Sequence, residues 1–334
     1  MKYEIFGESH GPAIGVVLTG VPAGLKLDRE FILAEMARRA PGQNSTSTAR
    51  KESDLPELVS GVVDDVTTGA PLCAMIRNSD QHSSDYSEFK RKPRPSHSDF
   101  AAWVRYDGHN DIRGGGHFSG RLTAPLVFAG AVAKLYLKQK GIEVTSVIRN
   151  IGGVDHPTQE QMEEVILQAR SENDSVGGIV GIQITNLPAG IGSPDRGENI
   201  EGEIARAMFA IPAVKGIQFG AGFRLASMRG SEANDALRME NGRVVTATNY
   251  SGGINGGISN GMPILFDVVF RPTPSIGKEQ ETVDLDTMEN TTLCIKGRHD
   301  PCVVLRARPV VEAAAALTIM DLMQRQPENM ERTL

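Results

Sequence analysis

The spacing of apolar residues predicts four helices along the chain. The clearest one begins at Thr158, because Thr158 and Gln161 form a capping-box pair and apolar residues then recur at helical spacing. Residues 121–139 are almost entirely apolar and small, with Gly141 just beyond, so this helix is expected to pack closely on several sides. The other two are expected over residues 28–40, with Asp28 as the N-cap, and over residues 309–323, with Pro309 in the first position.

Strand patterns alternate loosely with these helices, and no linker divides the chain. This predicts a single large α+β domain over residues 1–334, built from layered sheets and helices. Residues 38–54 and 77–120 lack a clear period and are expected to form mobile active-site loops, while residues 326–334 form a polar tail. Residues 114–133 and 297–316 both lead from a glycine-containing segment into an alanine-rich helix, by duplication or by coincidence. The expected strands cover residues 143–148, 178–185, 216–223, 243–248 and 263–269.

Charge and composition restrict the kind of partner. The formal net charge of −6 argues against a nucleic acid or an anionic membrane as the partner of the whole chain. No apolar run approaches the roughly 20 residues that span a bilayer, and residues 1–7 lack the apolar core of a signal peptide. The three cysteines form no CxxC pair and suggest no disulfide framework. A cytoplasmic protein is therefore expected.

Three titratable residues stand in turn-like surroundings that suit a functional site. His10 has small neighbours that would let a ligand approach the backbone, His97 lies in a polar segment after Arg94, and Asp300 precedes a proline. Taken alone, each of the three is more simply an ordinary turn residue. No HExxH, CxxC or HxH pattern occurs, so no metal site is predicted.

Glycines and arginines gather in the same unpatterned segments. The clusters at residues 114–116 and 252–257 suit backbone amides turned towards an anion or a planar ring, or else tight turns at sheet corners. Neither cluster matches the P-loop motif or the GxGxxG motif of a Rossmann fold, so nucleotide binding of the Rossmann type is not predicted. Arginines in the loops are either scattered surface charge or a pocket for a small polyanion, since guanidinium forks match phosphate and carboxylate.

Taken together and in this order, these segments resemble the chorismate synthase family over nearly the whole chain. Several separate motifs of this specificity in family order make coincidence an inadequate explanation. The matching segments are residues 7–11, 20–22, 38–42, 48–54, 78–81, 94–99, 113–121, 211–216, 252–260 and 297–302.

The resemblance implies a reaction, a cofactor and an assembly. The reaction is the seventh step of the shikimate pathway, a 1,4-anti elimination of phosphate from 5-enolpyruvylshikimate 3-phosphate that gives chorismate. It requires reduced FMN without net redox change, and whether NADPH or an external reductant reduces the FMN stays open. The implied fold is the family's β-α-β sandwich, assembled as a homotetramer.

The resemblance also assigns roles to individual residues. His10 would act as a general acid near the departing phosphate, His97 would protonate or steady the reduced flavin, and Asp300 would assist removal of the C6 hydrogen through the flavin N5. The residues implied to bind the substrate are Ser9, Arg39, Arg50, Arg94 and Arg121. The residues implied to bind the flavin are Ser119, Pro212, Ala213, Gly256, Arg271, Pro272, Thr273, Pro274, Ser275 and Arg298.

The chain departs from the family pattern at a few positions. His117 and Phe118 follow the glycine triplet where an arginine and a serine are common, Leu122 replaces a glutamate, and Ser45 stands where an arginine is common. These departures leave two rivals open. One is a lyase or hydrolase that works without flavin, and the other is a flavin- or polyanion-binding protein without catalytic activity.

Overall fold

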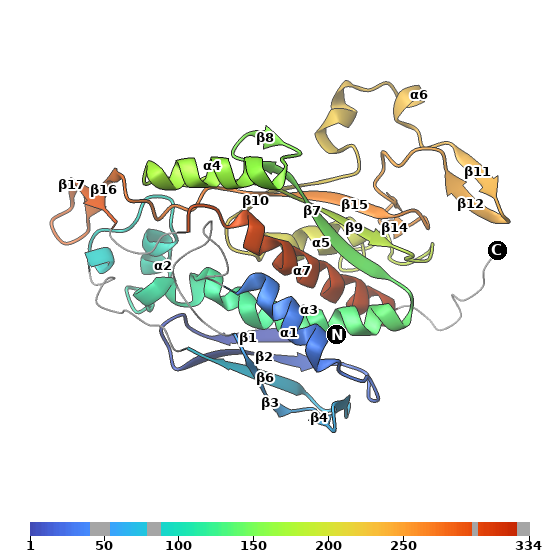
Figure 1. Cartoon of the computed structure of the whole chain (residues 1–334), viewed down its shortest axis with the longest axis horizontal. Helices are drawn as coiled ribbons and strands as arrows, with labels where there is room; N and C mark the ends of the chain where they lie inside the picture. Colours follow the sequence, from blue (N-terminus) through green and yellow to red (C-terminus); the bar gives the residue numbers. More distant parts are fainter. Residues whose placement is uncertain (41–53, 79–87, 296–299, 326–334) are drawn as a thin grey trace.

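Two antiparallel sheets enclose a layer of helices in the computed structural model (Figure 1). The structure describes residues 1–40, 54–78, 88–295 and 300–325. The first sheet has the order β1-β2-β6-β3 and the second has the order β10-β15-β9-β7-β8. Their strands are β1 (Lys2–Gly7), β2 (Ala13–Thr19), β3 (Pro56–Ser60), β6 (Leu72–Arg77), β7 (Glu143–Ile151), β8 (Val154–Asp155), β9 (Gly178–Thr185), β10 (Val214–Phe219) and β15 (Ile264–Phe270).

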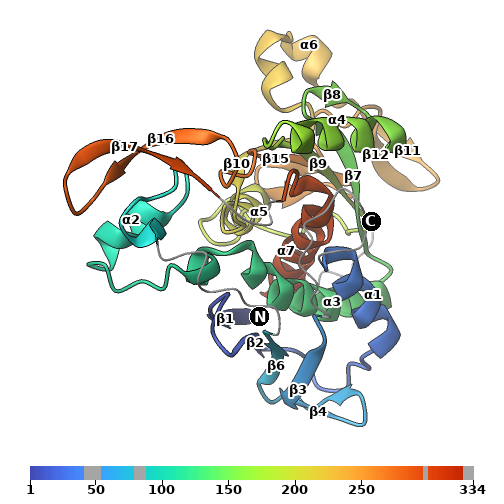
Figure 2. The same ribbon diagram turned by 60° about the vertical axis from the view of Figure 1, so that its left-hand side comes forward.

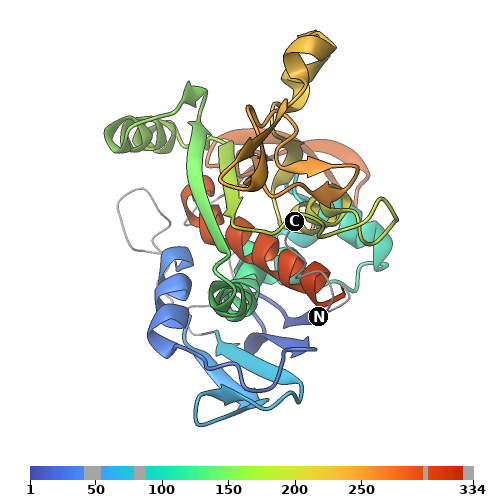
Figure 3. The ribbon, with the colours of Figure 1, turned by 90° about the vertical axis from the view of Figure 1, so that its right-hand side faces the viewer.

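The two alanine-rich helices form the centre of the helical layer. They are α3 (Thr123–Gln139) and α7 (Val304–Arg325), and they lie side by side between the sheets (Figures 1 and 3). Helices α1 (Arg29–Arg39) and α5 (Ile200–Phe209) flank them, while α4 (Gln159–Ser171) covers the opposite face of the second sheet (Figure 2). This arrangement confirms the predicted α+β sandwich in which helices separate two sheets.

Smaller elements project from this body. The segment that contains α6, β11 and β12 extends at one end of the molecule, and the hairpin of β16 and β17 extends at the other (Figure 1). The remaining elements are β4 (Val62–Val63), β5 (Val66–Thr67), α2 (Asp99–Arg105), η2 (Arg113–Phe118), η3 (Gly120–Leu122), η4 (Gly222–Ser227), α6 (Gly230–Ala233), β11 (Leu237–Glu240), β12 (Arg243–Thr246), β13 (Ile254–Asn255), β14 (Ile258–Ser259), β16 (Glu279–Asp284) and β17 (Glu289–Cys294).

Three of the four predicted helices form with the terminal signals that predicted them. Asp28 accepts a hydrogen bond from the N–H of Phe31 and so caps α1, and Thr158 with Gln161 makes the capping box of α4. Gly141 adopts a φ of +72° just past the end of α3. These signals are local, and no tertiary contact overrides them.

Several predicted boundaries were wrong, and one helix was missed. Strand β7 continues to Ile151 instead of ending at residue 148, and β12 ends at Thr246 instead of at residue 248. Helix α7 begins at Val304 rather than at Pro309, so Pro309 lies inside the helix, where it gives up the hydrogen bond to the Leu305 carbonyl and its ring crowds that carbonyl. The packing of α7 against α3 offsets this cost. Strand β10 ends at Phe219, where Gly220 turns the chain with a φ of +53°. Residues 77–120 contain α2, whose apolar side chains are largely exposed, so no helical period towards a core was visible. The tail at 326–334 and most of the predicted loop at 38–54 lie outside the described residues.

Helices α3 and α7 approach so closely that only a glycine fits at their contact. A Cβ atom on Gly130 would stand 2.1 Å from Cβ and 2.3 Å from Cα of Ala313. The neighbouring positions of α7 are alanines with almost no exposed surface. The small residues of these helices therefore set the thickness of the central layer.

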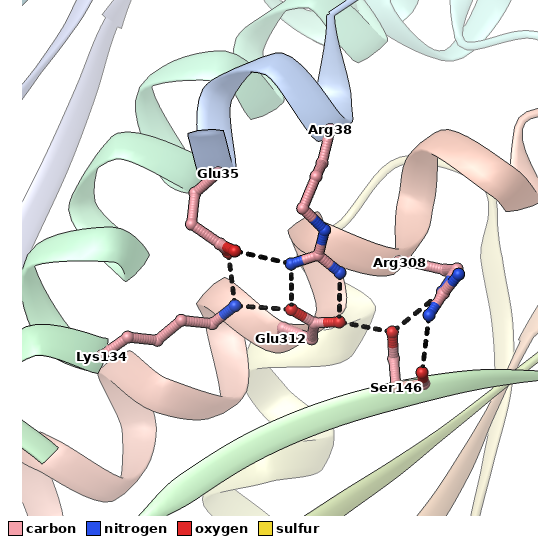
Figure 4. A network of polar contacts seen from close by, with 6 residues as sticks. All are labelled: Glu35, Arg38, Lys134, Ser146, Arg308 and Glu312. Atoms are coloured by element: carbon pink, nitrogen blue, oxygen red, sulfur yellow. Dashed lines mark hydrogen bonds and ion pairs between the residues drawn. The ribbon is translucent and has the colours of Figure 1, made fainter. Parts of the chain in front are cut away.

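A buried ionic network ties α1, α3 and β7 to α7 (Figure 4). Glu312 of α7 accepts hydrogen bonds from both terminal nitrogens of Arg38, from Lys134 and from the hydroxyl of Ser146. Burial opposes ionisation, but these partners outweigh it and hold the pKa of Glu312 at about 2. Because Arg38 precedes Arg39, the network holds the end of α1 that carries Arg39.

We expect Gly130→Ala to destabilise the protein by about 1–3 kcal/mol, because the new methyl group would overlap the backbone of α7. The same substitution in an unobstructed helix changes stability by less than about 1 kcal/mol or improves it. Gly202→Ala in α5 is the matched control, since the atom nearest to its Cβ position, Oδ1 of Asn199, lies at an ordinary contact distance of 3.5 Å. Urea unfolding of both variants measures the difference, and equal effects would contradict this account of the helix contact.

Candidate functional site

The glycine triplet lies between the two predicted catalytic histidines. Gly114, Gly115 and Gly116 have φ values of +60°, +84° and +54°, which L side chains rarely adopt. A Cβ atom on Gly114 would stand 2.6 Å from Nε2 of His10, and one on Gly115 would stand 3.6 Å from Nε2 of His97. The triplet therefore lets the backbone pass between two imidazoles and brings their segments, far apart in sequence, to one place.

His10 lies in a tight turn that the glycine segment supports. The N–H of Gly11 donates to the carbonyl of Glu8 over 3.0 Å and closes the turn, and the N–H of Ser9 donates to the carbonyl of Gly116 over 3.1 Å. His10 is 5% exposed and Ser9 is fully buried. The Ser9 hydroxyl makes no hydrogen bond within the described part of the chain, so it remains available to a ligand.

A buried carboxylate orients His97. Oδ1 of Asp99 lies 2.6 Å from Nδ1 of His97, and Arg94 donates to both oxygens of Asp99 over 2.7 and 2.8 Å. Burial opposes ionisation of Asp99, but these hydrogen bonds hold its pKa well below the usual range. Since Asp99 accepts the Nδ1 proton, Nε2 of a neutral His97 carries the free lone pair.

Burial lowers the pKa of His97, and the positive charges of Arg94 and Arg271 lower it further against the effect of Asp99. The His97 side chain is therefore neutral at neutral pH. Arg94 also donates to the hydroxyl of Ser275 over 3.3 Å. This contact connects His97 to the segment at 271–275.

Two buried arginines share one buried carboxylate on the other side of the site. Arg39 and Arg121 donate to different oxygens of Asp54, and all three side chains are at most 4% exposed. Burial lowers the pKa of Arg39 to about 10, with added repulsion from Arg121 and Arg306, while Asp54 raises it. Among the described residues, one carboxylate, that of Asp54, is thus shared by two guanidinium groups.

Asp300 lies beside these arginines. Arg306 donates to Oδ2 of Asp300 over 2.7 Å and to the carbonyl of Arg39 over 3.0 Å. Burial raises the pKa of Asp300 above its ordinary value, although Arg306 partly offsets the rise. Asp300 is therefore a better proton acceptor than an exposed aspartate.

The segments predicted to bind the flavin meet next to Asp300. The N–H of Val176 donates to the carbonyl of Pro301 over 2.9 Å, and the neighbouring Ser175 hydroxyl donates to the carbonyl of Thr273 over 2.7 Å. The N–H of Arg271 donates to the carbonyl of Ala213 over 3.0 Å, next to Pro212.

Two features of these segments suit a ligand. Ala213 has a φ of +71°, a strained value of the kind found at functional sites. Nε of Arg271 and the hydroxyl of Thr273 are buried and make no hydrogen bond to any described residue. A polar planar ligand would satisfy such groups, so these residues fit the flavin that the resemblance implies.

The structure does not bring every predicted residue together. Gly256 lies in the turn between β13 and β14, and the carbonyl of the adjacent Gly257 accepts from the N–H of Ile200 at the beginning of α5 over 3.0 Å. Ala213 follows the other end of this ten-residue helix, about 15 Å away by the rise per residue. Arg50 and Arg298 lie outside the described residues. Ser119 is close to the site, since its Cβ lies 3.6 Å from the Cβ position of Gly115.

Three residues of the site had no role in the sequence interpretation. Asp54, Asn78 and Asp99 lie within or beside motifs that carried the resemblance, but only the fold shows which arginine or histidine each one contacts. The sequence signal that could have identified them is an acidic or amide residue within a motif that also contains arginines, because such a residue can pair with an arginine.

The positions that depart from the family pattern have structural roles. Nδ1 of the exposed His117 lies 3.0 Å from the carbonyl of Gly7, so this nitrogen carries the proton and holds the start of the His10 turn. Phe118 stacks obliquely on Tyr106 with 6.3 Å between ring centroids, and Leu122 is buried in the core. Ser45 lies outside the described residues.

Two histidines and one aspartate lie close to buried arginines, an arrangement typical of enzymes that act on small anionic molecules. Among known proteins, the family model described as chorismate synthase matches residues 1–324. The chorismate synthase of Korarchaeum cryptofilum is 48% identical over 96% of this chain and 94% of its own length. That of Thermococcus gammatolerans is 46% identical over 98% of this chain and 96% of its own.

A solved structure described as the crystal structure of chorismate synthase matches the fold. Its TM-score is 0.75 at 26% sequence identity, over 96% of this chain and 91% of that chain. This chain belongs to the chorismate synthase family, and it is therefore a lyase. The resemblance inferred from the sequence and the predicted family fold are both confirmed.

The part of the chain that the structure describes lacks two further features. Within it, no helix combines the length and the apolar character needed to cross a membrane. Likewise, no three His, Cys, Asp or Glu side chains there come together as a set of metal ligands.

We expect Asp54→Asn to destabilise the protein by about 3–5 kcal/mol, because it would leave two buried guanidinium groups without their shared counter-ion. Asp65→Asn is the matched control, since Asp65 pairs with Arg29 through largely exposed side chains, and such a pair contributes at most about 1 kcal/mol. Urea unfolding at neutral pH measures both. A similar small loss in both variants would show that Asp54 is not needed to hold the arginines.

Proposed function

We propose that this chain is a chorismate synthase that removes phosphate and the C6 hydrogen from 5-enolpyruvylshikimate 3-phosphate, with reduced FMN bound, and that it works in the cytoplasm as its composition predicts. The observation that carries the proposal is that one glycine segment lies between His10 and His97, while Arg306 connects Asp300 with the segment that carries the buried Arg39. Family membership supports it independently.

The arginines provide binding and charge. Arg39 and Arg121 are oriented by Asp54, so their guanidinium groups are in place before the substrate arrives. The substrate carries a phosphate and carboxylates, and buried guanidinium groups stabilise both the bound anion and the departing phosphate. Ser9 adds a buried hydroxyl that lacks a partner within the described residues.

Arg94 has a different role from Arg39 and Arg121. Its Nε and Nη2 are engaged by Asp99 and its Nη1 by Ser275. We propose that Arg94 holds the carboxylate that orients His97, and that contact with the substrate falls mainly to Arg39 and Arg121.

The titratable groups move or hold protons at defined atoms. His10 donates a proton to the departing phosphate from its buried turn. His97, neutral with the proton on Nδ1, presents Nε2 as a hydrogen-bond acceptor to the flavin. Asp300, whose pKa is raised by burial, accepts the proton that derives from C6. Reduced FMN supplies an electron-rich ring for the elimination, and the residues that fit it are Ala213, Arg271, Thr273 and Ser275.

The direct test is anaerobic release of phosphate and formation of chorismate from 5-enolpyruvylshikimate 3-phosphate, with and without dithionite-reduced FMN, and with NADPH as an alternative reductant. We expect both products together, and only with reduced FMN. His10→Ala should retain FMN binding and lower turnover roughly 10²-fold or more. Phosphate release without flavin would favour a flavin-independent lyase or hydrolase. Flavin binding without turnover would favour a non-catalytic binding protein.

We further propose that the protein assembles as a homotetramer through the projecting segment at 220–248. Phe223, Leu237 and Met239 are 84, 73 and 69% exposed on this segment, which is a large apolar surface for a chain without a partner. Figure 1 shows the segment standing clear of the two sheets. A second copy of the chain would cover these side chains.

Sedimentation equilibrium measures the assembly. We expect a tetramer for the wild type and a smaller species for the double variant Leu237→Ser and Met239→Ser. Met288→Ser is the control, because Met288 is equally exposed but lies alone in the hairpin turn between β16 and β17. A monomeric wild type, or an unchanged mass in the double variant, would refute this interface.

A further inference from the structure

The side chain of Asn78 forms hydrogen bonds to two parts of the site. It follows the last residue of β6, and its Nδ2 donates to the carbonyl of Glu8 over 3.0 Å and to the carbonyl of Gly11 over 2.8 Å. Its Oδ1 accepts from Nε of Arg121 over 3.1 Å. One amide group therefore connects an arginine of the site with both ends of the turn that carries Ser9 and His10.

The partners determine which way the amide faces. Carbonyl oxygens only accept and the guanidinium Nε only donates, so Nδ2 must face the turn and Oδ1 must face Arg121. Both donors and the acceptor of the side chain are used in this orientation. A flipped amide would place oxygen against two carbonyl oxygens and nitrogen against a cation.

The base of the side chain is held by the first sheet. The last paired residues of β2 and β6 are Ala13 and Arg77, and the N–H of Asn78 extends this pairing by donating to the carbonyl of Pro12 over 3.2 Å. A short polar side chain on a rigid strand end places its partners more accurately than a loop residue would.

We infer that Asn78 is a positioning residue that fixes the distance between His10 and Arg121. The inference rests on the proposed function, in which His10 donates a proton while Arg121 binds the same substrate. If the turn shifts relative to the arginine, the proton donor no longer meets the leaving group, and a displacement of about 1 Å can cost roughly 10²-fold in rate.

Asn78→Asp separates the two halves of this contact. The carboxylate that Asn78→Asp introduces has the same shape as the amide and still accepts a hydrogen bond from Arg121. It has no N–H groups to donate, however, and it places a negatively charged oxygen against the carbonyls of Glu8 and Gly11. The His10 turn is released while Arg121 keeps its partner. The released turn should lower kcat, and because the new carboxylate also weakens the attraction of Arg121 for the anionic substrate, kcat is compared at saturating substrate.

The experiment is a double-mutant cycle of Asn78→Asp and His10→Ala, measured as anaerobic kcat with reduced FMN and saturating 5-enolpyruvylshikimate 3-phosphate. We expect Asn78→Asp to lower kcat about 10- to 100-fold when His10 is present, and less than about twofold in the His10→Ala background. Asn186→Asp is the control, because Nδ2 of Asn186 also donates to a backbone carbonyl, that of Gly141 over 2.9 Å, just past the end of α3 that is farther from Arg121.

Equal losses in both backgrounds, or no loss in the single variant, would overturn the inference, because Asn78 would then not act through His10. If Asn78→Asp does not fold, as judged by its thermal midpoint, Asn78→Ser goes through the same cycle with a hydroxyl too short to reach both carbonyls. A wild type that forms no chorismate would instead refute the proposed function, and a fully active His10→Ala would refute the role of His10.

Discussion

The burial of arginine side chains is the constraint on which this site depends. A guanidinium group cannot lose its proton at any physiological pH, so a buried arginine needs a carboxylate or another polar partner nearby. Asp54 serves Arg39 and Arg121, and Asp99 serves Arg94. Asp54 is shared, so each of the two guanidinium groups has only part of one carboxylate among the described residues, and in the proposed function the anionic substrate adds further negative charge. The same carboxylates give the guanidinium groups fixed directions, which flexible side chains would lack in water.

The second constraint on the site is the space between the two histidines, which only residues without side chains can pass through. Three consecutive residues with positive φ let the chain run between His10 and His97 without any side chain. The backbone there also accepts the N–H of Ser9 and thereby supports the His10 turn. A site that must hold two imidazoles near one substrate thus depends on residues that have no functional group of their own.

The sandwich places these parts by bringing together the ends of its elements. The end of α1 carries Arg39, the ends of β1 and β6 frame the His10 turn and Asn78, and the beginning of α7 carries Arg306. The network around Glu312 joins α1, α3, β7 and α7 in the layer behind the site. The close contact of α3 and α7 at Gly130 then fixes how far apart these ends lie. Catalytic geometry is in this sense a consequence of core packing.

The sequence by itself determined the family, the α+β class, the caps of α1 and α4, and the identity of most candidate residues. These features are local: a capping box, an alanine-rich helix or a glycine triplet depends on neighbouring residues alone. The sequence patterns misplaced the start of α7, because proline is expected at the first position of a helix and not in its second turn. They also missed α2, because its apolar residues are exposed and form no stripe that faces a core. Only the tertiary structure decided that Asp54 pairs with two arginines, that Arg94 serves Asp99, and that Asn78 reaches the His10 turn. Such pairings join residues that are distant in the chain, and they follow from how sheets and helices pack, which no local pattern encodes.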